Sequence, residues 1–276
     1  MKILVTGANG YLGRGVVNSL LDLGHEVIAT DYSTGNVDER ARTIAVDLFE
    51  LDNPYEYFLS PEIVLHLAWK DGFIHNSNSH LTELPNHYLF LEKMINSGVN
   101  DIVILGSMHE VGFFEGSINE NTPCNPINLY GISKNSLRRA IEILCQKNKI
   151  RFKWLRGYYI VGNSANGNSI FSKIVSAETR GEKEFPFTSG QNQYDFLDYK
   201  DFCNYVALAS TQSEIKGIIN ICSGKPMKLA ERVEIFIKTN NYSIKLKYGA
   251  YPDRNYDSKA LWGDDKLIKM IGNKTL

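Results

Sequence analysis

Cysteine is scarce in this chain, and no segment is both long and apolar. The four cysteines among 276 residues form no C-x-x-C pair, and no histidine stands at metal-ligand spacing from them. Neither a disulfide framework nor a metal site is therefore expected. No apolar run approaches the roughly 20 residues that a membrane span requires, and the N-terminus lacks a long apolar leader segment. We expect a cytoplasmic protein that holds no metal and spans no membrane.

An excess of charge of either sign is also lacking. The chain carries 30 Lys and Arg against 31 Asp and Glu, which gives a formal net charge of −1. Proteins that bind nucleic acid through its phosphates need a basic excess, so nucleic acid is not an expected partner. At this length a core is easily buried, and the 43% of hydrophobic residues is ordinary for a globular protein.

Short β-rich runs alternate with amphipathic stretches from the first residues onward. A strand is expected over Ile3–Thr6, and Leu12, Val16 and Leu20 then recur at helical spacing. The other elements expected in this half are strands at 25–31, 43–46, 62–69, 101–105 and 152–161, and helices at 84–97 and 133–147. Continuous apolar strands that alternate with helices predict an α/β fold, a Rossmann doubly wound parallel sheet with helices on both faces.

The pattern changes near residue 162. A polar run at 162–168 precedes shorter pieces, which are expected helices near 169–180, 201–210 and 229–239, an extended stretch at 185–188 and a strand at 218–222. We predict a dinucleotide-binding domain over 1–162 and a smaller α/β substrate domain over 163–276, with the chain crossing between them.

Three glycines mark a phosphate-binding loop. Gly7, Gly10 and Gly13 give the spacing G-x-x-G-x-x-G between the first strand and the first helix, where backbone N–H groups can approach a pyrophosphate. Asp31 lies 18 residues beyond Gly13, at the end of the second strand, where a carboxylate can accept ribose hydroxyls. Because a carboxylate repels a 2′-phosphate, NAD(H) is favoured. NADP(H) stays open because Arg40 and Arg42 are close in sequence.

A tyrosine, a lysine and a serine form the expected catalytic set. Tyr130 and Lys134 have the spacing Y-x-x-x-K, which places both side chains on one helical face. The ammonium is expected to lower the phenol pKa from about 10. Ser107 follows the 101–105 strand, at the sheet edge where ligands of α/β proteins bind. Together the three predict hydride transfer at a carbinol or carbonyl carbon.

These motifs resemble those of the extended short-chain dehydrogenases/reductases, in the NAD-dependent epimerase/dehydratase group that acts on nucleotide sugars. Further matches are Asp47-Leu48, at the position that contacts adenine in the family, and His66-Leu67-Ala68 after the fourth strand. Gly112 after Ser107 and the segment 155–162 also match. The resemblance covers nearly the whole chain.

The resemblance implies two sets of ligand-contacting residues. The cofactor set comprises Gly7, Asn9, Gly10, Tyr11, Leu12, Gly13, Asp31, Tyr32, Asp47, Leu48, Leu67, Ala68, Trp69, Tyr130, Lys134, Tyr158 and Ile160. The substrate set comprises Lys70, Ser107, Met108, His109, Tyr130, Asn168 and Arg254. The expected substrate is a nucleotide-diphosphate sugar, and Arg254 matches the family's late diphosphate-binding arginine.

The run after the fifth strand bears on the reaction. Dehydratases of the family carry T-D-E where this chain has Ser107-Met108-His109, followed by Glu110. Without that acid pair, dehydration lacks its general acid and base. The chain is most similar to the small nucleotide-sugar 4-ketoreductases that make dTDP-fucose or CDP-paratose. The implied reaction is reduction of dTDP-4-dehydro-6-deoxyglucose to dTDP-fucose, for a bacterial surface polysaccharide.

Two other functions stay open at this point. A nucleotide-sugar 4-epimerase needs the same three residues and a tightly held NAD, and a non-catalytic NAD(H)-binding regulator could use the same fold. The helices at 84–97 and 133–147 could pair into a homodimer, although core packing explains the same pattern.

Overall fold

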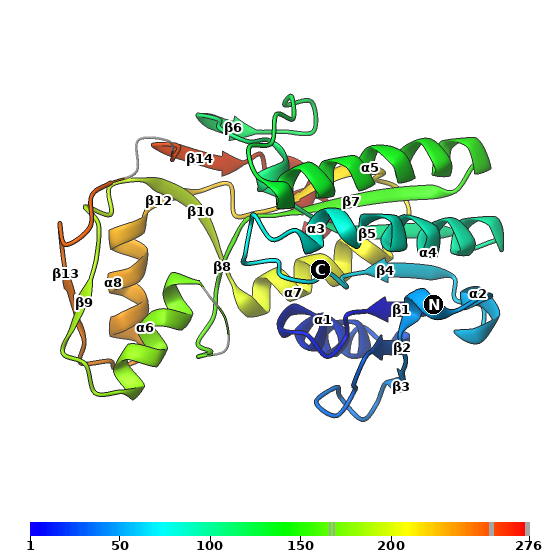
Figure 1. Cartoon of the computed structure of the whole chain (residues 1–276), viewed down its shortest axis with the longest axis horizontal. Helices are drawn as coiled ribbons and strands as arrows, with labels where there is room; N and C mark the ends of the chain where they lie inside the picture. Colours follow the sequence, from blue (N-terminus) through cyan, green and yellow to red (C-terminus); the bar gives the residue numbers. More distant parts are fainter. Residues whose placement is uncertain (166, 168, 254–256, 274–276) are drawn as a thin grey trace.

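A seven-stranded parallel sheet forms the centre of the protein in a computed structural model, which describes residues 1–165, 167, 169–253 and 257–273. The strands lie in the order β11-β7-β5-β4-β1-β2-β3 (Figure 1). Their bounds are β1 Lys2–Thr6, β2 Glu26–Asp31, β3 Arg42–Ala45, β4 Ile63–His66, β5 Asp101–Ser107, β7 Arg151–Gly157 and β11 Gly217–Ile221. The order reverses between β1 and β4, and the expected α/β doubly wound fold is confirmed.

Helices cover both faces of this sheet, because its strands are apolar on both sides. One core joins β1 side chains such as Ile3 and Val5 to helices α1, α7 and α9, while Leu4 points into a second core with α2, α4 and α5. The helix bounds are α1 Tyr11–Asp22, α2 Pro54–Tyr57, α4 Leu84–Asn96, α5 Leu129–Asn148, α7 Tyr199–Thr211 and α9 Lys266–Asn273. A short α3, Ser79–Thr82, and the 3-10 turns η1, Leu48–Glu50, and η2, Met108–Glu110, lie in the connections.

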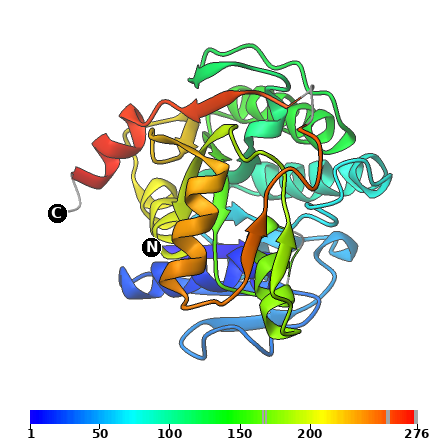
Figure 2. The ribbon, with the colours of Figure 1, turned by 90° about the vertical axis from the view of Figure 1, so that its left-hand side faces the viewer.

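A smaller layered part lies beside the sheet (Figure 2). It contains the strand order β12-β10-β14-β6, with β8 paired to β10, and a separate β13–β9 pair. Helices α6 and α8 pack on these strands around a third apolar core. The bounds are β6 Gly116–Ile118, β8 Tyr159–Val161, α6 Ile170–Thr179, β9 Glu184–Pro186, β10 Gln193–Asp198, β12 Pro226–Lys228, α8 Leu229–Thr239, β13 Lys245–Lys247 and β14 Ala260–Gly263. The division at residue 162 stays a prediction.

Two expected elements differ from the structure near the site. The single strand expected at 152–161 is wrong: β7 ends at Gly157, and β8 begins at Tyr159 and pairs with β10 instead of continuing in the central sheet. The helix expected at 133–147 begins earlier, at Leu129, because the Asn128 side chain caps it by accepting a hydrogen bond from the Gly131 N–H. Tyr130 consequently lies in the first turn of α5.

Candidate active site

The glycine loop brings three backbone segments into close contact. Gly7 has a left-handed φ of +68°, and a Cβ on it would lie 2.7 Å from the backbone N of Ala68. A Cβ on Gly13 would lie 2.1 Å from the Gly7 carbonyl oxygen. Helix α1 begins directly after the loop with no side-chain cap and no acidic residue in its first turn. The free N–H groups at its N-terminus can therefore bind an anion.

Asp31 braces this loop from the end of β2. Its Oδ2 accepts a hydrogen bond from the backbone N–H of Asn9 at 3.0 Å, and its Oδ1 accepts one from Tyr32 at 2.8 Å. The Asp47 carboxylate, which caps η1, lies near the Tyr32 hydroxyl and contributes to the raised pKa of Tyr32. These interactions hold Asp31, the expected ribose contact, and Asp47, the expected adenine contact, at the same edge of the sheet. A carboxylate has further lone pairs with which it can accept hydroxyl donors.

The segment after β4 forms the other wall of the loop. The Leu67 N–H donates to the Thr6 carbonyl at 3.2 Å, and the Ala68 N–H donates to the Thr6 hydroxyl at 3.3 Å. Leu67 packs on one core of the sheet, whereas Trp69 packs on the other. Leu48, the partner of Asp47 in the expected adenine contact, is buried in that second core.

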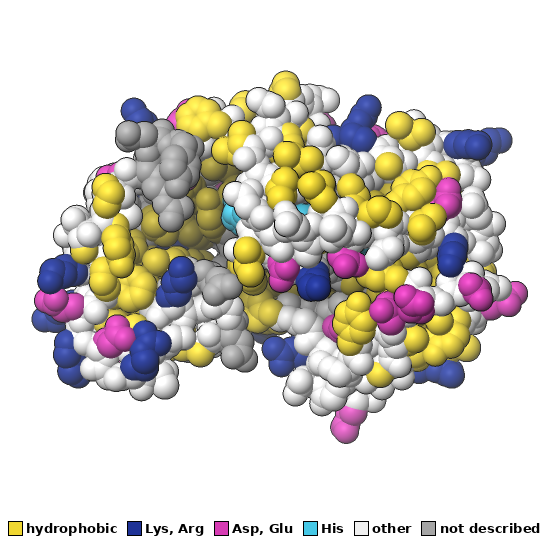
Figure 3. Space-filling view, in the orientation of Figure 1, with side chains coloured by type: hydrophobic (Ala, Val, Ile, Leu, Met, Phe, Trp, Pro, Cys, Tyr) yellow, Lys and Arg dark blue, Asp and Glu magenta, His cyan; other side chains and the backbone are white. Residues whose placement is uncertain are grey.

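Ser107, Tyr130 and Lys134 meet at the carboxyl end of β5. The Ser107 side chain lies close enough to the Tyr130 hydroxyl to lower the phenol pKa, and the Lys134 ammonium donates to the Leu105 carbonyl at 2.9 Å. Ser107 and Lys134 are 8% and 2% exposed, so the group is shielded from bulk water. Figure 3 shows the molecule hollowed between the part with α6 and α8 and the part with the central sheet.

The pKa values at this site differ from the expectation. Burial raises the pKa of Tyr130 above its ordinary value, and the Ser107 side chain only partly opposes this effect. Burial lowers the pKa of Lys134 to about 7, against the charge of Glu110, which raises it. The pKa of Tyr130 is thus raised and not lowered as expected, because desolvation of the phenolate is the largest effect and the Glu110 charge acts in the same direction.

Glu110 lies below Ser107 and points into the protein interior. It is fully buried, and its Oε1 accepts a hydrogen bond from the Ser107 backbone N–H at 2.5 Å. The Trp154 indole N–H lies 2.9 Å from both carboxylate oxygens, and the Arg156 guanidinium lies 3.6 Å away. Arg138 adds a longer contact at 3.9 Å. Glu110 is thus committed to interior partners and cannot supply the acid that dehydration needs.

Aromatic side chains surround Tyr130 on its other sides, and the sequence did not reveal this group in full. The His75 ring is nearly parallel to that of Tyr130, with 5.7 Å between centroids, and His109 lies 4.1 Å from His75. His80 and Trp69 lie 5.2 and 6.2 Å from the Tyr130 ring. Four ring side chains, three of them imidazoles, therefore surround one tyrosine.

A family model decides which proteins the chain belongs with. The model described as the NAD dependent epimerase/dehydratase family matches residues 3–222. The chain belongs to this family. The expected membership in the extended short-chain dehydrogenases/reductases is confirmed, and so is the NAD dependence that the family's description states.

Individual relatives agree with this assignment. The chain is 45% identical over 269 residues to the dTDP-6-deoxy-L-talose 4-dehydrogenase (NAD(+)) of Aggregatibacter actinomycetemcomitans, covering 95% of this chain and 99% of the relative. It shares its fold with the UDP-glucose 4-epimerase of Thermotoga maritima, at 23% identity with a TM-score of 0.83 over 99% of this chain and 93% of the other. A UDP-N-acetylglucosamine 4-epimerase from Methanobrevibacter ruminantium matches with a TM-score of 0.85 at 20% identity, covering 98% and 91%.

The residues of the loop fit the family's dinucleotide. At Gly13 the backbone segments are so close that no side chain fits, and no side chain caps the N-terminus of α1. Both features suit a bound pyrophosphate. Of the two arginines that left NADP open, Arg40 is bound to Asp22 and Asp38, each at 2.8 Å, and Arg42 is an exposed residue of β3. With Arg40 paired and the Asp31 carboxylate at the end of β2, NAD is favoured over NADP.

The cofactor contacts expected of Tyr158 and Ile160 and the substrate contact expected of Lys70 stay predictions. The Tyr158 side chain is buried in the third core, and its hydroxyl donates to Asn220 at 3.3 Å. Ile160 packs partly buried against the first core, and Lys70 is exposed. Asn168 and Arg254 fall outside the described residues.

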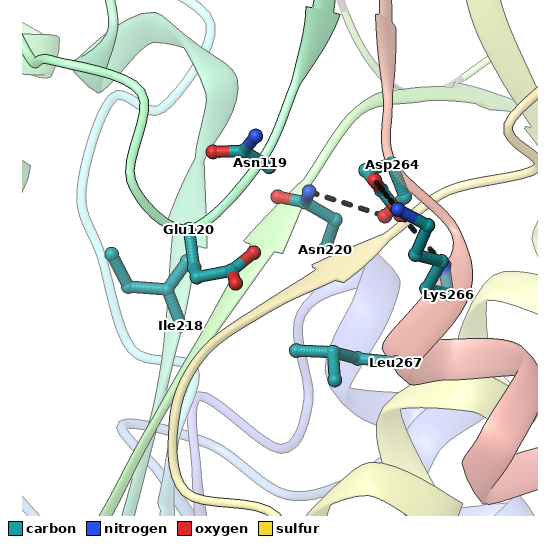
Figure 4. A pocket seen from close by; sticks show the side chains of 7 residues that line it. All are labelled: Asn119, Glu120, Ile218, Asn220, Asp264, Lys266 and Leu267. Atoms are coloured by element: carbon teal, nitrogen blue, oxygen red, sulfur yellow. Dashed lines mark hydrogen bonds and ion pairs between the residues drawn. The ribbon is translucent and has the colours of Figure 1, made fainter.

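A small polar hollow also lies beside β11 and β14 (Figure 4). Asn220 donates to the Asp264 carbonyl at 3.3 Å, and Lys266 pairs with the Asp264 carboxylate at 3.4 Å. None of the residues that line this hollow belongs to the set around Tyr130.

In the described part of the chain, no helix is long and apolar enough to cross a bilayer. The same residues include no cluster of three or more His, Cys, Asp or Glu side chains that could hold a metal.

Proposed function

We propose that the protein reduces the C4 ketone of a nucleotide-activated 4-keto-6-deoxyhexose with NADH. The observation that carries this proposal is the meeting of Ser107, Tyr130 and Lys134 beside the glycine loop, with Glu110 turned away into the interior. Such a site has a proton donor for an alkoxide and no carboxylate free for elimination of water.

The chain's own residues have distinct roles in this reaction. NADH, when bound, supplies the hydride. Tyr130 donates its hydroxyl proton to the oxygen at C4 as the negative charge develops there. Ser107, whose side chain lies beside the Tyr130 hydroxyl, holds the same oxygen. Lys134 places a positive charge next to the phenol and is proposed to contact the ribose of the bound cofactor.

The substrate side is proposed from two sources. The relative at 45% identity acts, by its name, at C4 of dTDP-6-deoxy-L-talose, which supports a dTDP-linked 6-deoxyhexose here. The resemblance to small 4-ketoreductases favours dTDP-fucose as the product. Lys70, Met108 and His109, with Asn168 and Arg254, are the proposed contacts to the nucleotide sugar. A cytoplasmic location and a role in surface polysaccharide synthesis belong to the same proposal.

An NADH-coupled assay tests the reaction. The enzyme is mixed with NADH and either dTDP-4-dehydro-6-deoxyglucose or the 4-ketone of dTDP-6-deoxy-L-talose, and the product is read by NMR for its C4 configuration. We expect one NADH consumed per sugar reduced. The Tyr130→Phe variant should lose about 10²–10⁴-fold in kcat. No consumption of NADH with either ketone would contradict the proposal.

The same assay separates the alternatives. A 4-epimerase would interconvert the C4 epimers with no net loss of NADH, and a regulator would bind NADH without turning over any sugar. A homodimer through α4 and α5 remains part of the proposal, and light scattering of the purified protein would give its mass in solution.

A further inference from the structure

Trp69 presents its ring to the catalytic lysine. The Lys134 Nζ lies 3.8 Å from the centroid of the Trp69 ring. The centroid of the Tyr130 ring is farther away, at 5.9 Å. Lys134 is 2% exposed, so little water reaches its ammonium group. A cation over the face of an indole is attracted by the ring's quadrupole, most strongly where water is excluded.

Two histidines fix the position of this indole. The Trp69 Nε1–H donates to His80 Nδ1 at 3.0 Å, and the indole stacks on His87 with 4.5 Å between centroids and 14° between planes. His80 Nε2 lies 3.0 Å from the Ile74 carbonyl. Because an indole N–H can only donate, His80 Nδ1 must accept, and the histidine proton must be on Nε2. His80 therefore holds Trp69 only while it is neutral.

The loop that carries Trp69 is itself built onto the catalytic helix. Asp71 accepts hydrogen bonds from the hydroxyls of Ser77 and Ser79, both at 2.8 Å. The Tyr130 backbone N–H donates to the His75 carbonyl at 2.9 Å. Residues 69–80 thus cap the N-terminus of α5 and cover the side chains of Tyr130 and Lys134 at the same time.

We propose that Trp69, held by His80, is a positioning residue for the catalytic pair: its indole face fixes the Lys134 side chain and stabilises the ammonium form in a buried site. The proposal deepens the proposed function and rests on it for its kinetic consequence. The groups that face Lys134 are the Glu110 carboxylate from η2, His66 from β4, His87 from α4 and Tyr130 from α5.

The sign of the effect follows from these surroundings. Burial lowers the pKa of Lys134 to about 7, and Glu110 opposes this shift. His66 and His87 are buried and neutral, since desolvation lowers the pKa of each. Removal of the indole face takes away stabilisation of the ammonium alone, so the pKa of Lys134 should fall further. Loss of a desolvated cation–π contact corresponds to about one pH unit.

A direct titration tests this proposal without any substrate. Lysines labelled with ¹³C at Cε are followed by NMR against pH, and the Lys134 signal is assigned by its loss in Lys134→Met. In Trp69→Leu we expect its midpoint to move down by about one pH unit. Trp69→Phe, which keeps a weaker aromatic face, should give a smaller downward shift. Trp262→Leu, in β14 of the smaller part, is the matched control and should leave the midpoint unchanged.

The kinetic arm follows the pH dependence of kcat/KM with NADH. Activity should fall as the pH rises through the pKa of Lys134, and in Trp69→Leu this falling limb should move to lower pH by the same amount. An unchanged Lys134 midpoint in a folded Trp69→Leu protein would overturn the proposal, and if that variant does not fold, an unchanged midpoint in Trp69→Phe does so. A protein with no ketoreductase activity but a shifted midpoint would refute the proposed function alone.

Discussion

Gly13 gives the sharpest test of the cofactor loop. An alanine Cβ at this position would lie 2.1 Å from the Gly7 carbonyl oxygen and 2.8 Å from the Ala8 Cα. Both neighbours are backbone, so no side-chain rotation can relieve the clash. The loop and the start of α1 must separate by about 1 Å to restore a normal contact.

This displacement should affect stability and cofactor binding separately. Overpacking of this kind costs about 1–3 kcal/mol, which corresponds to a fall in Tm of roughly 3–10 °C for a chain of this size. A displaced loop also misplaces the N–H groups of α1. Each hydrogen bond lost from a charged phosphate costs about 1.5–3 kcal/mol, so NADH should bind about 10–100-fold more weakly.

Gly10 provides a matched control three residues away. A Cβ there would lie 3.2 Å from the same Gly7 oxygen, and the residue has an ordinary φ of −68°. The neighbour needs to move by only a few tenths of an ångström. Gly10→Ala should therefore weaken NADH binding much less than Gly13→Ala does.

Titration of NADH fluorescence and thermal unfolding with and without NADH measure both effects. Because a ligand that binds only the folded state stabilises it by RT ln(1 + [L]/Kd), the NADH-dependent rise in Tm should be smaller in Gly13→Ala than in the unchanged protein. Equal affinities for the two alanine variants would show that the close approach of Gly13 to Gly7 does not shape the cofactor site.

Three further predictions follow from buried groups. Ser107→Ala should lower kcat by about 10²–10³-fold by removing one hydrogen bond to the developing alkoxide, and Ser107→Thr should recover part of it; equal rates for the two would argue against a role for the hydroxyl. Glu110→Gln should lower the free energy of unfolding by about 3–5 kcal/mol, because two arginines lose their buried partner. Urea unfolding measures this change, with Glu120→Gln as the exposed control. Equal free energies of unfolding for the two variants would contradict the prediction. Burial lowers the pKa of His66 and His87 below that of the unfolded chain, so the unfolded state binds more protons as the pH falls below about 6.5. The free energy of unfolding should therefore fall by about 3 kcal/mol between pH 8 and pH 5.5. Urea midpoints that do not change with pH over this range would refute this prediction.

Local sequence signals were enough for the central sheet and the cofactor loop. Apolar strands and helical spacing over Leu12, Val16 and Leu20 predicted α1 and its neighbours, because these patterns depend only on residues close in sequence. The glycine spacing likewise placed Gly7, Gly10 and Gly13 between β1 and α1. The spacing of Tyr130 and Lys134 in one helix was confirmed for the same reason.

The strand break at Tyr158 was not predictable from local pattern. Residues 152–161 are continuously β-prone, and only the competition between two sheets makes the chain leave β7 at Gly157 and pair again with β10. The same strand did carry one weak signal for its buried ion pairs. Lys153 and Arg156 are charges in an otherwise apolar segment, and both are fully buried. Charges in such a strand require buried partners, which are Asp101 and Glu110.

The role of Glu110, the partner of Arg156, was not predictable for a related reason. In sequence, Glu110 stands one position beyond the run that aligns with the dehydratases' acid pair, and nothing local shows that it is buried. Its burial depends on Trp154 and Arg156, which lie more than 40 residues away in the chain. The histidines around Trp69 are similar, since His80 and His87 meet Trp69 only through tertiary packing.

Glu110 also bears on the direction of the reaction. Burial raises the pKa of Tyr130 and the Glu110 charge adds to this rise, whereas burial lowers the pKa of Lys134 to about 7 and Glu110 opposes this fall. A raised phenol pKa keeps the proton on Tyr130, and the Glu110 charge favours the ammonium form of Lys134 beside it. A protonated phenol is the form that donates to an alkoxide, whereas oxidation of an alcohol needs the phenolate. From its buried position, the Glu110 carboxylate therefore supports the reduction that we propose.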